Sequence, residues 1–215
     1  IICFLGYKFK NDVCKKNITL FLIAISLIQE IFDYLNRFFW SDLYIMKIQT
    51  DLPLQLCHFA YWFSVICLIC QLYNWNNRQF YFNCAYFLGF SGALQGIITV
   101  DLTGIYTLSD MLALHLQHSF IIMNLLWLIF AYGFKFNYKG VIQAFLFTNS
   151  LVLFVGTINY LLDANYMFLC TPPAVDNPLL FGEWPYYILN LEIIFFIYGY
   201  FLTTPFLVIK HLNKK

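Results

Sequence analysis

Long apolar runs set the strongest limit on what this chain can fold into. They cover residues 18–38, 54–73, 80–100, 112–132, 141–162 and 185–209. About 20 consecutive apolar residues cross the hydrocarbon core of a bilayer as a helix, and a spanning helix satisfies its backbone hydrogen bonds internally. The runs are continuous, whereas a transmembrane β-barrel would show short alternating segments. The sequence therefore predicts an all-α, polytopic membrane bundle with six complete transmembrane helices, forming one integral membrane domain over residues 1–215.

The composition agrees with this prediction. Apolar residues make up 61% of the chain and charged residues 11%, against about half and about a quarter in a soluble domain. Residues 1–9 form an apolar segment too short to span, which we interpret as the remnant of an N-terminal seventh helix. A net charge of +1 offers no basic patch for nucleic acid. Membrane lipids are therefore the expected partners, and no nucleic-acid partner is predicted.

Basic residues fall almost entirely on one side of this six-helix arrangement. Arg37 and Lys47 lie on the other side, and the first set consists of Lys8, Lys10, Lys15, Lys16, Arg78, Lys135, Lys139, Lys210, Lys214 and Lys215. Cytoplasmic loops of membrane proteins carry an excess of Lys and Arg. We therefore expect a multi-pass protein of the cell membrane with its C-terminus in the cytoplasm.

Cysteines and glycines within the runs have packing interpretations. The chain has seven cysteines, an odd and scattered set that does not form a disulfide framework. Cys67-x-x-Cys70 lies in mid-helix, where cysteine behaves as a small hydrophobe. Gly92 and Gly96 have the spacing that lets membrane helices approach closely. No cofactor is predicted.

Polar residues inside the runs gather toward the non-cytoplasmic side. They are Glu30, Asp33, Cys57, His58, Gln95, His118, Asn159, Asn190 and Glu192, with Tyr61, His115 and Tyr160 as further lining residues. Ionisable groups in a membrane tend to face a cavity or one another, so we expect a polar cavity in the outer leaflet half. The alternative is that these groups only join helices by hydrogen bonds. Glu30 and Asp33 share a helix face and are expected to point inward, toward His118 or Asn159.

Three chemistries fit such a cavity. Cys57 could act as a nucleophile with His118 as its base, because the thiolate is the reactive form. His115-x-x-His118 could contribute two imidazoles to a metal site, although no recurring ligand pattern accompanies them and no metal is predicted. Carboxylates at Glu30, Asp33 and Glu192 could carry protons or ions in transport.

Several segments resemble one family. Leu52-Pro-Leu-Gln-Leu-Cys57 resembles the Leu-Pro-Leu-x-Leu-Cys signature of the YwaF-type bacterial integral membrane proteins. His118-Ser119 is similar to that family's His-Gly, with serine in place of glycine. The stretch from Asn159-Tyr160 to Asn165-Tyr166-Met167 resembles its Asn-Tyr…Asn-Tyr-Met segment, and Gly182-Glu-Trp-Pro-Tyr186 fits as well. The likeness covers nearly the whole chain.

The resemblance carries an expectation about function. A eukaryotic relative of the YwaF type is described as a transmembrane acyltransferase that acts on ether phospholipids and uses a cysteine and a histidine. This implies Cys57 as acyl carrier and His118 as its base. The expected function is phospholipid or fatty-acyl transfer in a bacterial membrane. The alternative is a non-enzymatic transporter or lipid-binding protein that uses the same cavity.

Overall fold

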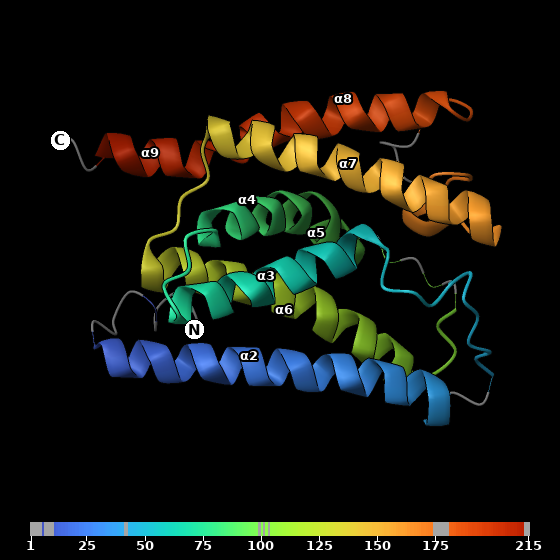
Figure 1. Cartoon of the computed structure of the whole chain (residues 1–215), viewed down its shortest axis with the longest axis horizontal. Helices are drawn as coiled ribbons and strands as arrows, with labels where there is room; N and C mark the ends of the chain where they lie inside the picture. Colours follow the sequence, from blue (N-terminus) through green and yellow to red (C-terminus); the bar gives the residue numbers. More distant parts are fainter. Residues whose placement is uncertain are drawn as a thin grey trace.

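The computed structural model describes residues 6, 11–40, 43–98, 100, 102, 104–173 and 181–212, and every regular element in these ranges is helical. The predicted all-α membrane bundle is confirmed, and each of the six apolar runs is largely helical (Figure 1). The remnant of a seventh helix, predicted at residues 1–9, lies outside the described residues except for Gly6.

The helices follow the apolar runs closely. Helix α2 spans Asp12–Leu35 and continues as a π-helical turn, Asn36–Trp40. The remaining helices are α3 (Leu56–Leu72), α4 (Arg78–Leu88), α5 (Leu94–Ile98), α6 (Leu108–Tyr132), α7 (Tyr138–Leu162), α8 (Tyr186–Phe201) and α9 (Thr204–Leu212). A second π turn, Gly89–Ala93, joins α4 to α5, and a 3₁₀ turn, Tyr166–Phe168, follows α7. Within the described part, four helical stretches are long and apolar enough to cross a membrane, and α3 is a shorter apolar helix.

Local sequence signals explain several helix ends. The side chain of Asn11 accepts a hydrogen bond from Val13 N–H at the start of α2, and Asn137 does the same for Gly140 N–H in α7. Thr107 and Asp110 form a reciprocal capping box at the start of α6. Gly133, at φ 73°, ends α6 in the left-handed conformation that glycine adopts without strain.

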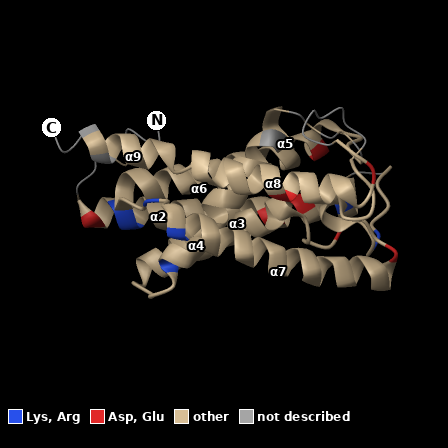
Figure 2. Cartoon of the chain, turned by 90° about the horizontal axis from the view of Figure 1, so that it is seen from above, with Lys and Arg blue, Asp and Glu red and all other residues tan. Residues whose placement is uncertain are grey.

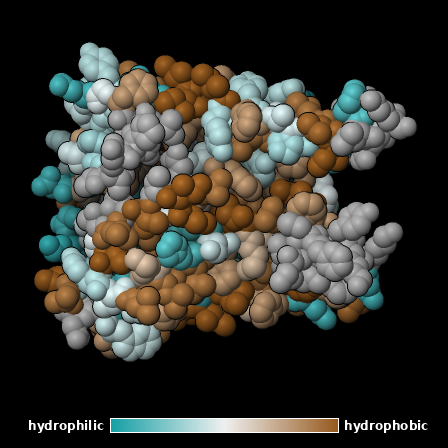
Figure 3. All heavy atoms as spheres, turned by 180° about the vertical axis from the view of Figure 1, so that it is seen from behind, coloured by the Kyte–Doolittle hydropathy of each residue, from teal (hydrophilic) through white to brown (hydrophobic). Residues whose placement is uncertain are grey.

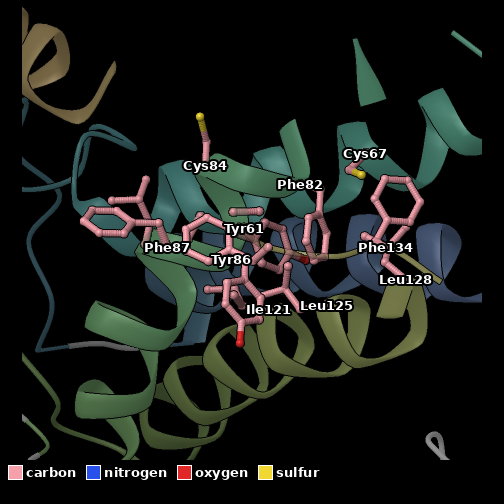
Figure 4. Packing of buried hydrophobic residues seen from close by; sticks show 14 of the residues in the cluster. Tyr61, Cys67, Phe82, Cys84, Tyr86, Phe87, Ile121, Leu125, Leu128 and Phe134 are labelled. Atoms are coloured by element: carbon pink, nitrogen blue, oxygen red, sulfur yellow. The ribbon is translucent and has the colours of Figure 1, made fainter. Parts of the chain in front are cut away.

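The helices pack in order across the bundle. Helix α2 lies along one edge and α8 along the other, with α3, α4 and α6 between them (Figure 1). Contacts join α2 to α6 and α3, α3 to α4, α4 to α7, and α7 to α8. The main core lies where α3, α4 and α6 meet, around Tyr61, Phe82, Tyr86, Ile121 and Leu125 (Figure 4).

The surface of the bundle is largely apolar. Figure 3 shows apolar residues across the middle of one face. Helix α2 is the clearest case: its outward residues include Phe21, Ile28 and Ile31, each at least 60% exposed. Its buried residues are mostly polar, namely Thr19, Ser26, Gln29, Glu30 and Asp33, with Leu22 among them. This reversed polarity suits a helix whose outer face meets lipid.

Candidate functional site

A buried polar cluster lies where α2, α3 and α6 meet, toward the end of the bundle that carries most of its acidic residues (Figure 2). Glu30 and Asp33 come from α2 and are each 6% exposed, and Gln117 and His118 come from α6 and are each 5% exposed. Both carboxylates therefore face inward, as the sequence predicts. We call these four residues, with His58 of α3, the polar cluster.

The partner of Asp33 differs from the expected one. Arg37, one turn further along, donates to Asp33 from Nε at 3.2 Å and from Nη2 at 2.7 Å. Its Nη1 also donates to Asp51 Oδ1 at 3.1 Å. The prediction that His118 or Asn159 would pair with the carboxylates is therefore wrong for Asp33. An arginine at i+4 already satisfies both of its oxygens with the planar fork that suits a carboxylate.

Asp51 organises the loop that leads to α3. It accepts hydrogen bonds from the Lys47 N–H at 2.7 Å, the Thr50 hydroxyl at 2.8 Å and the Tyr44 hydroxyl. Burial opposes ionisation of Asp51, but these bonds and Arg37 outweigh it, so the pKa of the carboxyl lies below its ordinary value. Burial and the bond to Asp51 raise the pKa of Tyr44 to about 12. Asp51 is therefore a charged anchor between the loop and α2.

Cys57 is the second residue of α3, in the first turn of the helix. The neighbouring His58 N–H donates to the Gln55 carbonyl at 3.0 Å, and Cys57 is half-buried. Glu30 and Arg37 lie close enough to act on it electrostatically. First-turn N–H groups have no partner inside their own helix and favour negative charge. The fold therefore places the cysteine in the first turn of α3, near Glu30 and Arg37.

His118 presents one ring nitrogen to a carbonyl and the other to a glycine. Its Nδ1 lies 2.8 Å from Leu114 O. A carbonyl only accepts, so we assign the proton to Nδ1, and Nε2 then keeps its lone pair. Nε2 faces Gly96 of α5, where an added Cβ would lie 2.7 Å away. His118 and His58 are close enough to interact electrostatically. No hydrogen bond joins His118 to the Cys57 thiol, although both residues are described.

Polar atoms in the cluster lack partners. Gln117 faces the Glu30 carboxylate, yet Glu30 Oε2 and Gln117 Nε2 are buried without a hydrogen bond. The same is true of His58 Nδ1. Buried polar atoms in native proteins nearly always have a partner, and an exception calls for an explanation. These three atoms belong to α2, α6 and α3, and they are candidate contacts for a bound polar group.

Two of the expected lining residues serve the fold instead, and a third faces outward. Tyr61 is fully buried, and its hydroxyl donates to Ser26 O. Asn159 binds the main chain of Tyr166 on both sides, through Nδ2 to the carbonyl at 2.9 Å and through Oδ1 from the N–H at 2.8 Å. Tyr160 is 87% exposed, because the next residue along a helix is rotated by about 100°. Its assignment to the cavity is therefore wrong.

The remaining expected residues lie apart from the cluster or cannot be placed. Glu192 of α8 accepts from Asn149 Nδ2 of α7 at 3.0 Å and borders a shallow, otherwise apolar groove with Phe145 and Phe196. The prediction of one cavity containing Glu192 is thus wrong, since α7 and α4 lie between α8 and α2 (Figure 1). His115 is half-buried. The Gln95 side chain lies outside the described part.

A metal site has no support in the described part of the chain. No group of three or more His, Cys, Asp and Glu side chains there could hold a metal ion. His115 and His118 lie one turn apart on α6, but a zinc site needs three or four protein ligands. The cysteines of Cys67-x-x-Cys70 are buried in the apolar core, in agreement with a packing role.

Sequence reasoning did not assign Arg37, Asp51 or Gln117 to the site. A signal for Arg37 was present, because it follows Asp33 at the i+4 spacing of helical ion pairs. Asn36 of the π turn, which donates to Asp110 Oδ1 at 2.5 Å, was also missed. Its partner lies in another helix, and no periodicity within α2 reveals it.

A bundle of apolar helices around a buried polar cluster defines the class: a multi-pass, helical integral membrane protein. Within that class the chain belongs to the TMEM164 family, since the sequence profile of this transmembrane family matches residues 1–203. No curated protein and no solved structure matches the chain.

Proposed function

We propose that this protein is a membrane acyltransferase that moves a fatty-acyl group between lipids through a thioester on Cys57. The observation that carries the proposal is the position of Cys57, in the first turn of α3 and within electrostatic reach of Glu30 and Arg37. The likeness to the YwaF type and its acyltransferase relative supports the same assignment. Its setting is a bacterial cell membrane, with the C-terminus in the cytoplasm.

His118 is the proposed base. With the proton fixed on Nδ1 by Leu114, its Nε2 can accept the thiol proton. The ring and the thiol must then approach each other, and catalytic hydrogen bonds commonly tighten only when substrate binds. His58 follows Cys57 directly and is rotated about 100° around the helix, which makes it a poorer partner for the sulfur.

The reaction is a double transesterification that needs no further reactant. Cys57 gives its proton to His118, and the sulfur attacks the ester carbonyl of a donor phospholipid. The C–S bond forms, the C–O bond to the glycerol breaks, and the leaving oxygen takes the proton from His118. An acceptor hydroxyl then loses its proton to His118 and attacks the thioester. The ester forms, the C–S bond breaks, and the thiolate recovers its proton.

The direct test uses purified full-length protein and acyl-labelled phospholipid. Hydroxylamine-sensitive label should be found on Cys57 by mass spectrometry. Cys57→Ser should abolish the label and the activity, and His118→Ala should lower the rate by about 10²–10⁴-fold, the usual worth of general base catalysis. Cys67→Ala serves as a control because its thiol lies in the core. Full lipid-remodelling activity in Cys57→Ser would refute the proposal.

A second candidate, non-enzymatic transport, rests on a different observation. Polar groups continue from Glu30 along the buried face of α2 toward the basic end. Asn124 donates to Ser26 and Ser64, at 3.2 and 3.1 Å. Thr19 is hydrogen-bonded to Tyr132 and Trp127. Leu22 interrupts this line of polar groups. Proton flux into vesicles that falls in Glu30→Gln but persists in Cys57→Ser would favour transport.

A further inference from the structure

Two segments that stand out in the sequence meet directly in the fold. One is the loop at residues 48–55, which leads to Cys57, and the other is residues 159–168, which we call the 159–168 turn. The Tyr166 hydroxyl donates to Ile48 O at 2.6 Å and accepts from Leu52 N–H at 2.9 Å. The Met167 N–H donates to Gln55 Oε1 at 2.8 Å. Three hydrogen bonds thus join the 3₁₀ turn after α7 to the segment that precedes α3.

Apolar side chains also pack together at this contact. Val155, Ala164, Tyr166 and Met167 form a second buried cluster, and the partly buried residues against it are Leu52, Leu54, Leu56, Phe59, Val152, Leu162 and Leu169. The alternate leucines of the Leu-Pro-Leu-x-Leu-Cys segment therefore face the turn. This leaves the segment little freedom to slide, because packed side chains tolerate few alternative positions.

The turn itself is held in an unusual backbone conformation. Asp163, Met167 and Phe168 all have positive φ, at 52°, 57° and 52°. Residues other than glycine adopt this left-handed region rarely, and such strain persists only where the surroundings enforce it. Here the two hydrogen bonds between the Asn159 side chain and the Tyr166 main chain provide that constraint. A turn that is held in this strained conformation is rigid and can hold another segment in place.

The contact with the 159–168 turn also determines how α3 is capped at Gln55. Gln55 occupies the N-cap position of the helix, yet its side chain makes no capping bond and is engaged by Met167 instead. A capping side chain would have occupied first-turn N–H groups. With its side chain turned toward Met167, Gln55 still accepts from the His58 and Phe59 N–H groups through its backbone carbonyl, at 3.0 and 3.3 Å, so the first turn of α3 is anchored at Gln55.

We propose that Tyr166 and Gln55 are positioning residues that fix the first turn of α3 and the direction of the Cys57 thiol, with Asn159 acting through Tyr166. The inference rests on the proposed function for its catalytic consequence, but the positioning can be measured without activity. It also assigns a structural role to the Asn-Tyr…Asn-Tyr-Met segment, because residues of this segment hold the backbone at Cys57 in place.

The test measures how fast iodoacetamide alkylates Cys57 in the purified full-length protein, by peptide mass spectrometry. Gln55→Leu removes one hydrogen bond and should raise the rate by about fivefold, because a loosened first turn exposes the half-buried thiol more often. Tyr166→Phe removes two and should raise the rate at least as much. Both should slow thioester loading by about 10–100-fold, because misplacement near 1 Å has costs of that order. Gln55→Glu keeps an acceptor for Met167 and should restore the wild-type alkylation rate. Tyr160→Phe, on the exposed neighbour, should match wild type.

Cys67 and Cys84 report on folding in the same sample, because both are buried in the core. If Tyr166→Phe exposes them, the Gln55→Leu and Gln55→Glu pair decides the question. An unchanged Cys57 rate in every one of Tyr166→Phe and Gln55→Leu that stays folded would overturn the inference. If the Cys57 alkylation rate changes but the protein never forms a thioester, the proposed function is refuted and the positioning role is retained.

Discussion

At the scale of single residues, the His118 ring is closely contacted at both of its nitrogens. Leu114 O holds one ring nitrogen, and the other lies against the backbone at Gly96. Gly92, four residues earlier, has open space where a Cβ would be added. The expected close approach of helices at Gly92 and Gly96 is therefore met at Gly96 only, and this glycine makes room for the imidazole.

Gly96→Ala should consequently displace the His118 ring. We expect a loss of about 1–3 kcal/mol in stability from overpacking, together with a fall in acyl transfer. Gly92→Ala is the matched control, and it should keep activity and gain up to about 1 kcal/mol from helix propensity. Thermal unfolding in detergent and thioester loading measure the two effects. Equal behaviour of the two variants would contradict the role of Gly96.

At the scale of elements, the loop before α3 depends on one carboxylate. Asp51 gathers Tyr44, Lys47 and Thr50 and links them to Arg37 of the π turn. Tyr166 then ties the same loop to the 159–168 turn. The approach to Cys57 is thus fixed from two sides, by an ion pair on the α2 side and by neutral hydrogen bonds on the α7 side.

This arrangement predicts a specific acid sensitivity. The pKa of Asp51 is lowered from 3.8, so its stabilising effect is complete above that value and is lost as the pH falls through the lower, folded-state pKa. Stability should therefore decline below about pH 4 more steeply in wild type than in Asp51→Asn, which should be less stable than wild type at pH 7. Unfolding temperatures between pH 7 and pH 3 measure this, with the exposed Glu183→Gln as control. Parallel wild-type and Asp51→Asn curves would show that Asp51 is not responsible.

At the scale of the whole molecule, charge divides the bundle along its length. Basic residues collect mainly at the end where α2 and α4 begin, and most acidic residues lie toward the other end (Figure 2). Arg37 belongs to the acidic end but is neutralised by Asp33 and Asp51. The excess positive charge at one end favours its retention in the cytoplasm.

Labelling of single cysteines tests that orientation. Cys14 lies near the start of α2, and Cys170 is exposed in the segment after α7. On intact cells an impermeant maleimide should label a variant that keeps only Cys170. A variant that keeps only Cys14 should react after permeabilisation alone. The reverse pattern would invert the orientation and move the polar cluster to the cytoplasmic half.

The fold was predictable because apolar length and turn residues are local signals. The capping box at Thr107 and the glycine at position 133 set helix ends that lie within a few residues of the predicted ones. The site was predictable only in part. Depth along the helices correctly placed Glu30, Asp33 and His118 near one end, but depth carries no information about rotation. Tyr160 and Glu192 were therefore grouped with residues that they do not approach.

The polar inner face of α2 also has a consequence for biogenesis. Gln29 donates to Ala113 O and Asn36 to Asp110, at sequence separations of 84 and 74 residues. At about 5–20 residues per second, α6 leaves the ribosome several seconds after α2. During that interval Glu30 lacks its α6 neighbour Gln117, and an unpaired charge in lipid costs about 2.5 kcal/mol or more. Nascent α2 must therefore be held beside the insertion machinery until α6 arrives, and a chain truncated before residue 107 should be degraded faster than the full-length protein.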